Sequence, residues 1–237
     1  RIMFHSFSEP SSPEQGPPRL ATLRKEMLAA GVDGFIVPRA DAHQGEYVAE
    51  RDSRLAWLTG FTGSAGYCVA LRDKASVFVD GRYRVQVRVQ VADVFTPVDW
   101  PEVTLGDWLT EHVAPNGVVG FDPWLHTVSQ IRDLEATTPS VTLQRTEDLV
   151  DRIWEDQPDP PASHAFVQPV DLAGEAHKDK IARLATTLGP ARCAVLTLPD
   201  SICWLLNIRG DDLPRTPFML GFALLHANGT VTLFVNP

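Results

Sequence analysis

The chain has 237 residues, of which 44% are hydrophobic, and it carries a formal net charge of −9 at pH 7. This length and apolar content suffice for two domains with separate cores, whereas the negative charge argues against nucleic acid or an anionic membrane as a partner. The sequence has no run of 18 apolar residues and no basic segment followed by an apolar one at its start, so it predicts neither a transmembrane helix nor a signal peptide.

The first predicted elements follow a polar N-terminal stretch. Residues 1–18 are rich in Ser, Pro, Gln and Gly, cannot build a core, and are predicted to form a mobile tail. A helix is predicted next, and Gly31 closes it in the C-terminal capping position. Residues 35–37 then form a predicted buried strand, which Pro38 ends. The apolar face of the helix consists of Leu20, Leu23, Met27 and Leu28.

The stretch from Arg54 to Tyr83 gives the clearest pattern in the chain. It starts with an apolar segment around Trp57 and continues through a short loop marked by glycines. Two strands are predicted next, at 67–71 and 76–79, with charged residues as the turn between them. The stretch therefore predicts a β-hairpin that follows a glycine-containing loop.

The segment from Arg84 to Val91 alternates polar and apolar residues without interruption, which by itself predicts a strand. Further along, a short helical piece is predicted to end at Ile153 and Trp154, before an acidic, proline-rich linker. The alternation of strands and helices between these points indicates a layered α/β domain. The intervening helices are predicted at 105–113 and around 129–134, and the strands at 118–121 and 141–143.

The same order of parts returns near the C-terminus. A helix, a strand and a tryptophan-containing segment again precede two further strands, between positions 181 and 235. Trp57 and Trp204 are separated by 147 residues (204 − 57), which fits a duplicated domain and not a short solenoid repeat. The second copy has no counterpart of the residues that follow Asp80 in the first, so we expect it to be incomplete.

The three cysteines, Cys68, Cys193 and Cys203, each lie within an apolar segment. Such positions favour buried free thiols over a disulfide framework. Free thiols are typical of a reducing compartment, so we expect a cytoplasmic protein.

Motifs for catalysis are scarce. The seven histidines are scattered, without metalloprotease spacing or a neighbouring cluster of ligands, so we expect no metal site within this chain. Ser64 lies in a segment similar to a nucleophile elbow, but position 62 is threonine where that motif requires glycine. A tight turn of small residues is the favoured interpretation.

Two residues remain as candidates for binding. His43 lies in a loop that is longer in the first copy than in the second, although a solvated loop histidine is the simpler interpretation. Arg82 follows a strand and a glycine, where a guanidinium could hold a carboxylate or a carbonyl. An exposed arginine at the start of a helix explains it equally well, so chemistry alone assigns neither residue.

Five segments, which occur in order between Leu20 and Pro237, together resemble a known family. They are Asp41-Ala42-His43-Gln44-x-Glu46-Tyr47, Gly60-Phe61-Thr62-Gly63-Ser64-Ala65-Gly66, Asp80-Gly81-Arg82-Tyr83, Asp148-Leu149-Val150-Asp151-Arg152-Ile153-Trp154 and Cys203-Trp204-Leu205-Leu206-Asn207-Ile208-Arg209-Gly210. Through them the chain resembles the N-terminal region, domain I and part of domain II, of three-domain Xaa-Pro aminopeptidases of the creatinase/prolidase family.

The resemblance implies a fold. We expect an α/β chain of two tandem creatinase/prolidase N-terminal-type domains, each a mixed β-sheet flanked by helices in a ribonuclease-H-like arrangement, with the second truncated. Domain I would span residues 19–156, a linker 157–163, and domain II 164–237. In this family the segment after Asp-Gly-Arg-Tyr is helical, so we predict a helix at Tyr83–Val91 in spite of its alternation.

The resemblance also implies a function. Full-length relatives remove the N-terminal residue from peptides with proline in second position, using a dinuclear metal site, usually manganese, in a C-terminal "pita-bread" domain that this sequence lacks. It implies no catalytic residue and no metal ligand in this chain. Arg82 and, more weakly, His43 would bind substrate, while the chain as a whole would help to gate substrate length and to assemble a homo-oligomer.

A function of another class remains open. Similar folds occur in proteins without the metal site, including a histone-chaperone subunit whose N-terminal region resembles these peptidases. The chain could therefore belong to a non-enzymatic module that binds a protein or a peptide.

Overall fold

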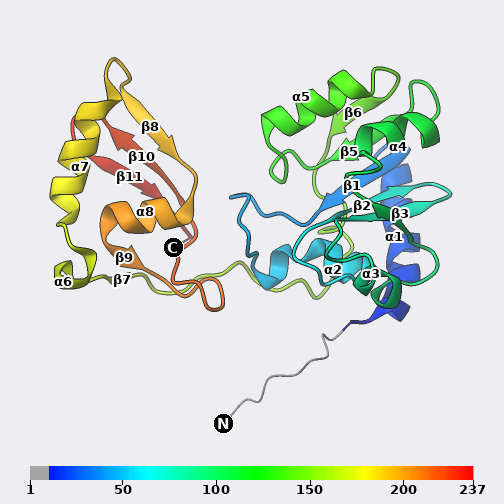
Figure 1. The fold of residues 1–237 in the computed structure, drawn as a ribbon, viewed down its shortest axis with the longest axis horizontal. Coiled ribbons are helices and arrows are strands. Elements are labelled where there is room, and N and C mark those ends of the chain that lie inside the picture. Colours follow the sequence, from blue (N-terminus) through cyan, green and yellow to red (C-terminus); the bar gives the residue numbers. More distant parts are fainter. Residues whose placement is uncertain (1–10, 237) are drawn as a thin grey trace, which may run out of the picture. The chain divides into compact units, whose positions relative to one another are not determined.

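The computed structural model describes residues 11–236. The chain divides into two compact units, the first comprising 1–46 with 50–158 and the second 47–49 with 159–237. The first unit is built on a six-stranded mixed sheet and the second contains a three-stranded antiparallel sheet (Figure 1). Within residues 11–236, no helix is both long and apolar enough to cross a membrane.

The sheet of the first unit has the strand order β4-β3-β2-β1-β5-β6. Strand β2 runs antiparallel to both of its neighbours, whereas the pairs β3–β4, β1–β5 and β5–β6 are parallel. The strands are β1 (Gly34–Pro38), β2 (Tyr67–Leu71), β3 (Ala75–Val79), β4 (Thr96–Asp99), β5 (Val118–Phe121) and β6 (Thr142–Arg145), and the helices are α1 (Gly16–Ala29), α2 (Arg54–Thr59), α3 (Gln86–Gln90), α4 (Leu105–His112) and α5 (Val128–Thr137).

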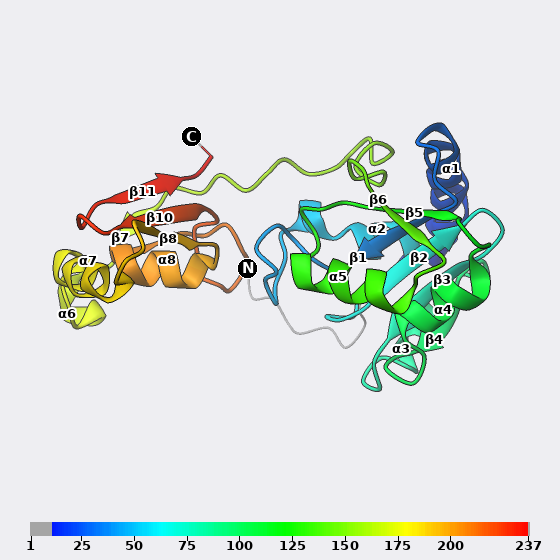
Figure 2. The ribbon, with the colours of Figure 1, turned by 90° about the horizontal axis from the view of Figure 1, so that it is seen from above.

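Helices cover both faces of this sheet. One face packs against α1, α2 and α3 in a first core, and the other packs against α4 and α5 in a second. Figure 2 shows α1 and α5 on opposite sides of the sheet. Because successive side chains of a strand point to opposite faces, β1 contributes Phe35 and Val37 to the first core and Ile36 to the second. The predicted mixed sheet flanked by helices is confirmed.

The predicted helix near Tyr83–Val91 is confirmed as α3, preceded by a turn. Gln86 and Gln90 are one helical turn apart, and both donate from their side-chain amides to the Thr62 hydroxyl, at 3.3 and 2.8 Å. Val87 is fully buried among the helices of the first core, while Val85 and Val89 are 81% and 75% exposed. The polar–apolar alternation therefore belongs to a helix in which one valine, Val87, and one glutamine, Gln90, are buried, and the glutamines bind the glycine-containing loop.

The tail prediction is wrong for residues 11–18, while residues 1–10 lie outside the described part of the chain. Helix α1 begins at Gly16, and the Ser11 hydroxyl donates to the carbonyl oxygens of Gly60 (2.7 Å) and Gln90 (3.1 Å). Gly60 ends α2 in a left-handed conformation with φ of 87°, which glycine adopts at little cost. The polar side chain of Ser11 binds two backbone carbonyl groups, a role that composition alone does not reveal.

The second unit repeats the element order of the first. The series α7, β8, α8, β10, β11 matches α1, β1, α2, β2, β3, and β10 runs antiparallel to both β8 and β11 as β2 does to β1 and β3. Trp57 lies in α2 and Trp204 in α8, so the duplication predicted from these residues is confirmed. The elements are β7 (Phe166–Val167), α6 (Val170–Ala173), α7 (His177–Ala185), β8 (Cys193–Leu196), α8 (Pro199–Leu206), β9 (Ile208–Arg209), β10 (Phe222–His226) and β11 (Val231–Phe234).

Two local predictions are wrong. Cys193 is exposed, because β8 is an edge strand that pairs only with β10 within the described residues, whereas Cys68 and Cys203 are buried as free thiols. The segment ending at Trp154 forms turns and no helix. There the Asp148 side chain accepts from the backbone N–H groups of residues 150 and 151, at 2.8 and 3.1 Å, a local bond that competes with helix formation.

Candidate functional site

The candidate site lies at one edge of the six-stranded sheet. Strands β1, β3, β4, β5 and β6 all run in the same direction, because β2 is antiparallel to both neighbours and the remaining pairs are parallel. Their carboxyl ends therefore meet at a single edge, which is where α/β sheets usually bind ligands. The loops that start at this edge carry the residues singled out from the sequence.

Arg82 lies in the turn after β3 and is held by Asp80. Its Nη2 donates to Asp80 Oδ2 at 2.7 Å, and the Arg82 backbone N–H donates to Asp80 Oδ1 at 2.9 Å. These hydrogen bonds lower the pKa of Asp80 and raise that of Arg82. The side chain is 64% exposed, and its Nη1 makes no hydrogen bond within the described residues. The guanidinium is thus oriented by one carboxylate and keeps donors for another acceptor.

The glycine-containing loop before β2 packs beside the Arg82 turn. The hydroxyls of Ser64 and Tyr83 lie 2.5 Å apart, and the Tyr83 ring meets Phe61 edge to face at 5.6 Å. A Cβ at Gly63 would overlap the Phe61 ring, so this position requires glycine. Ser64 contacts a phenol, and within residues 11–236 no histidine base is hydrogen-bonded to it, which supports the interpretation as a tight turn.

His43 lies in the loop after β1, and Asp41 positions its backbone. The Asp41 carboxylate is buried, and its Oδ1 accepts from the N–H groups of His43 and Gly45, both at 3.0 Å. The intervening Gln44 has a φ of 56°, which completes a tight side-chain-stabilised turn. The loop conformation is therefore fixed by one buried aspartate.

The structure places Arg82 and His43 at the same edge without a hydrogen bond between them. They follow β3 and β1, which are separated by β2, so their backbones are offset by about 10 Å across the sheet. Glu46, from the His43 loop, adds to the charges that raise the pKa of Arg82. The Glu46 carbonyl in turn accepts from Arg39 Nη1 at 2.8 Å. The two predicted residues share one surface, but they do not form a single contact pair.

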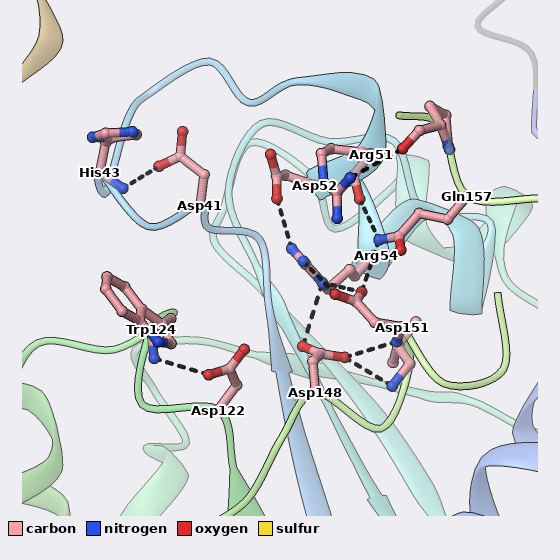
Figure 3. A network of polar contacts seen from close by, with 12 residues as sticks. Asp41, His43, Arg51, Asp52, Arg54, Asp122, Trp124, Asp148, Asp151 and Gln157 are labelled. Atoms are coloured by element: carbon pink, nitrogen blue, oxygen red, sulfur yellow. Dashed lines mark hydrogen bonds and ion pairs between the residues drawn. The ribbon is translucent and has the colours of Figure 1, made fainter. Parts of the chain in front are cut away.

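Sequence reasoning missed a buried ion cluster centred on Arg54 (Figure 3). The Arg54 side chain is 6% exposed and binds Asp151 with two hydrogen bonds, from Nε at 2.6 Å and from Nη2 at 2.8 Å. Asp52 accepts from Nη1 at 2.9 Å, and Asp148 Oδ2 lies 3.3 Å from Nε. Gln157 links Asp151 to the chain beyond it, with its amide donating to Asp151 at 2.8 Å. One buried guanidinium thus faces three carboxylates.

The cluster has more acids than its single arginine neutralises. Burial raises the pKa of Asp148 to about 6, against the opposing charge of Arg54. Burial also raises the pKa values of Asp52 and of Asp122, which follows β5 at the same edge. Burial disfavours the charged form of Arg54, but the hydrogen bond to Asp151 and the nearby carboxylates raise its pKa overall.

No local sequence pattern predicts this cluster. Arg54 and Asp151 are far apart in the chain, and charged residues at their spacing are ordinarily solvated. Their only hint is that Asp148 and Asp151 belong to one of the family-like segments. Within residues 11–236, no group of three or more His, Cys, Asp or Glu side chains is arranged to hold a metal ion. The cluster therefore organises structure around arginine.

Two family models match the chain, and together they cover nearly all of it. Both are described as the creatinase/prolidase N-terminal domain, one matching residues 19–153 and the other residues 156–237. The chain belongs to the creatinase/prolidase N-terminal domain family. The resemblance that the five segments carry is thereby confirmed, and the tandem arrangement of two such domains with it.

Curated relatives of this creatinase/prolidase chain are named as peptidases. A probable Xaa-Pro aminopeptidase P from Neosartorya fischeri is 37% identical over 221 residues, which cover 87% of this chain and 33% of the relative. The corresponding protein from Coccidioides posadasii is 34% identical over 244 residues, covering 97% of this chain and 37% of the relative. The chain thus spans about a third of the length of the curated relatives it matches.

A solved structure shares the fold of both units. The X-prolyl aminopeptidase from Caenorhabditis elegans matches with a TM-score of 0.85 and 29% sequence identity, over 93% of this chain and 39% of that one. That protein is described as a cytosolic enzyme with a di-nuclear active site. The α/β fold predicted for a creatinase/prolidase N-terminal region is confirmed by this match.

Proposed function

We propose that this chain is the non-catalytic N-terminal portion of a metal-dependent Xaa-Pro aminopeptidase, which removes the N-terminal residue from peptides with proline in second position. The observation that carries the proposal is the similarity to proteins named Xaa-Pro aminopeptidase P along 87–97% of this chain and only a third of theirs. The residues beyond that third would carry the hydrolysis, and the protein would act in the cytoplasm, as the similar nematode enzyme is described.

The catalytic metal would be held outside the described residues. The similar nematode enzyme has a di-nuclear site, and we propose a dinuclear metal site, with manganese as the metal, for the whole protein. Residues 11–236 offer no group of ligands for it. When bound, such metals lower the pKa of a water molecule so that it can attack a peptide carbonyl.

Arg82 is the residue proposed to contact substrate. It is exposed at the carboxyl edge, Asp80 fixes its direction, and Nη1 remains available to a peptide carbonyl or carboxylate. His43 is a weaker candidate at the same edge, on a loop that Asp41 holds in place. Through these loops the chain would gate substrate length, and through its other surfaces it would support a homo-oligomer.

A non-enzymatic binding module is the less favoured alternative. The curated relatives described above are named as peptidases. Metal ligands in the residues that follow Pro237 in the parent gene would support the peptidase, and their absence would favour the module.

Replacing Arg82 in the full-length enzyme tests the proposed contact. Arg82→Ala is expected to lower kcat/KM for an Xaa-Pro peptide by about 10- to 100-fold, because a hydrogen bond to a charged group contributes about 1.5–3 kcal/mol. Arg82→Lys should recover part of the loss, since it restores the charge without the planar fork. The measurement is steady-state kinetics on purified enzyme with a fixed metal content.

A second arginine provides the matched control. Arg72 is also exposed and paired with an aspartate, Asp33 at 3.0 Å, but it lies in the hairpin between β2 and β3, at the opposite edge of the sheet. Arg72→Ala should leave kcat/KM within twofold, and His43→Ala should have a smaller effect than Arg82→Ala. An unchanged kcat/KM in Arg82→Ala would return this residue to the interpretation as an exposed arginine at a helix start.

The isolated chain of 237 residues is expected to be inactive. It should not hydrolyse an Xaa-Pro peptide with added manganese, because the described residues lack a ligand group for the metal. The measurement is product release over several hours at increasing protein concentration. Turnover that rises in proportion to chain concentration through repeated purification would contradict the assignment of catalysis to residues outside this chain.

A further inference from the structure

A cavity of about 520 Å³ lies within the first unit, on the face of the sheet that α4 and α5 cover. Ile36 of β1 and the ring of Tyr67 line it from the sheet, and Leu105, Ile131 and Leu134 line it from the helices. Its volume falls within the range of about 300–1,000 Å³ typical of small-molecule sites. Trp100, which is 41% exposed, also lines it.

Most polar side chains of the lining already have partners in the protein. Gln130 forms a capping box with Thr127 at the start of α5. The Thr104 hydroxyl donates to Asp107 at 2.6 Å, and the Gln44 amide donates to a backbone carbonyl at 3.3 Å. A ligand could engage these groups only by replacing bonds that exist, so they offer little affinity.

The hydroxyl of Tyr67 is different. No hydrogen bond joins it to another described residue, and its ring is stacked on Phe78 with the centroids 4.6 Å apart. The Nε2 atom of His126, which also lines the cavity, is buried and has no hydrogen-bond partner among the described residues. Burial raises the pKa of Tyr67, so the phenol stays neutral and can both donate and accept. A fixed, uncommitted hydroxyl in an apolar cavity is the arrangement that orients a small ligand.

The charges of the lining exclude an ionic ligand. Arg39 and Asp133 carry opposite charges, and Arg39 already donates to the Glu46 carbonyl at 2.8 Å. Burial lowers the pKa of His126 to about 4, so this residue is neutral at physiological pH. No net charge is therefore available to offset the desolvation of an ion.

We propose that this cavity is a binding site for an uncharged, ring-sized molecule with an apolar body and one hydrogen-bonding group, which pairs with the Tyr67 hydroxyl. The body occupies the space between Ile36, Leu105 and Ile131. Apolar cavities of about 150 Å³ already bind benzene, so the available volume is ample. Gln44 and Gly66 also line the site, so its ligand contacts both the loop of His43 and the loop before β2.

Titrating the 237-residue chain with phenol, toluene and benzoate tests the site. Methyl resonances of Leu105 and Ile131, recorded with methyl-labelled protein, are expected to shift with phenol and toluene and to stay unchanged with benzoate. In Tyr67→Phe, the dissociation constant for phenol should rise about 2- to 10-fold, the value of one neutral hydrogen bond, while that for toluene should stay the same.

Two further variants keep the result interpretable. Tyr47→Phe removes an exposed hydroxyl outside the lining and should not change the binding of either probe. Ile131→Trp fills the cavity and should abolish the Leu105 shifts for both probes, with circular dichroism as the check of folding. The absence of methyl shifts at concentrations up to the solubility limits of phenol and toluene would overturn the proposal. An equal rise of the two dissociation constants in Tyr67→Phe would overturn it as well.

Discussion

Arg54→Met is expected to lower the free energy of unfolding of the first unit by about 3–5 kcal/mol at pH 7, because it leaves buried carboxylates without their cation. The Arg54 side chain is 6% exposed and that of Asp148 is 3% exposed, so solvent screens this pair little. Asp151 is 30% exposed and can recover some hydration, which favours the lower part of the range. Urea denaturation, monitored by tryptophan fluorescence, measures the loss.

The loss should depend on pH in a defined direction. Protonation of the carboxylates removes their repulsion, so the deficit of Arg54→Met relative to wild type is expected to shrink as the pH falls from 7 to 4.5. Arg152→Met is the matched control, since Arg152 is 42% exposed and pairs with Glu147 at 2.9 Å. An exposed pair contributes about 0–1 kcal/mol. Equal losses in the two variants would contradict a special role for the buried cluster.

The cluster joins two segments that are distant in sequence. Its acids come from the turn before α2 and from residues 148–151, and the same contact is extended by Trp57, which stacks on Trp154 with the centroids 5.1 Å apart. The Gln157 amide also donates to the carbonyl of Arg51, at 3.0 Å. The segment that leaves the first unit is therefore fastened to α2 by charge, by stacking and by backbone contacts.

The elements of the fold followed from the sequence where apolar pattern and turn residues agreed. The strand at 67–71 was predicted with the bounds that β2 has, because the segment is apolar and charged residues follow it. In the structure β2 pairs with β1 on one side and with β3 on the other. Strand β4 was missed, because Thr96–Asp99 is a short edge strand with partly exposed residues and proline within it. The helix α3 needed the family resemblance, since its alternation alone predicts a strand.

The candidate site was only partly accessible from the sequence. Arg82 and His43 stood out because they lie in segments with turn residues and a family pattern, and the structure places both at the carboxyl edge. The role of Arg54 depends on burial and on partners nearly one hundred residues away, which no local pattern encodes. The position of the Tyr67 hydroxyl in a cavity likewise depends on the packing of α5 against the sheet, which the sequence does not predict.

The contributions of Asp148 and His126 to the pH dependence of stability should nearly cancel around pH 5, because burial shifts the pKa values of these two groups in opposite directions. Burial raises the pKa of Asp148 from 3.8 to about 6, so its contribution to stability is present below 3.8 and is lost as the pH rises through 6. Burial lowers the pKa of His126 from 6.5 to about 4, so its contribution is present above 6.5 and is lost as the pH falls through 4.

Near pH 5, folding therefore takes up one proton at Asp148 and releases one at His126. When one of these groups is removed, the effect of the other on the pH dependence of stability is no longer cancelled. In Asp148→Asn the free energy of unfolding, relative to wild type, should rise with pH by about 1.4 kcal/mol per unit between 4.5 and 5.5, and in His126→Phe it should fall by the same amount. The double variant should return to the slope of wild type.

The slope is the informative quantity, since each substitution also changes packing by an amount that is the same at every pH. Asp52 and Asp122, whose pKa values burial also raises, titrate in all four proteins and cancel when slopes are compared. Urea denaturation in half-unit steps from pH 4.5 to 6 supplies the measurement. Parallel curves of unfolding free energy against pH for wild type and both single variants would show that neither group changes its proton occupancy on folding. This result would contradict the pKa shifts attributed to burial for Asp148 and His126.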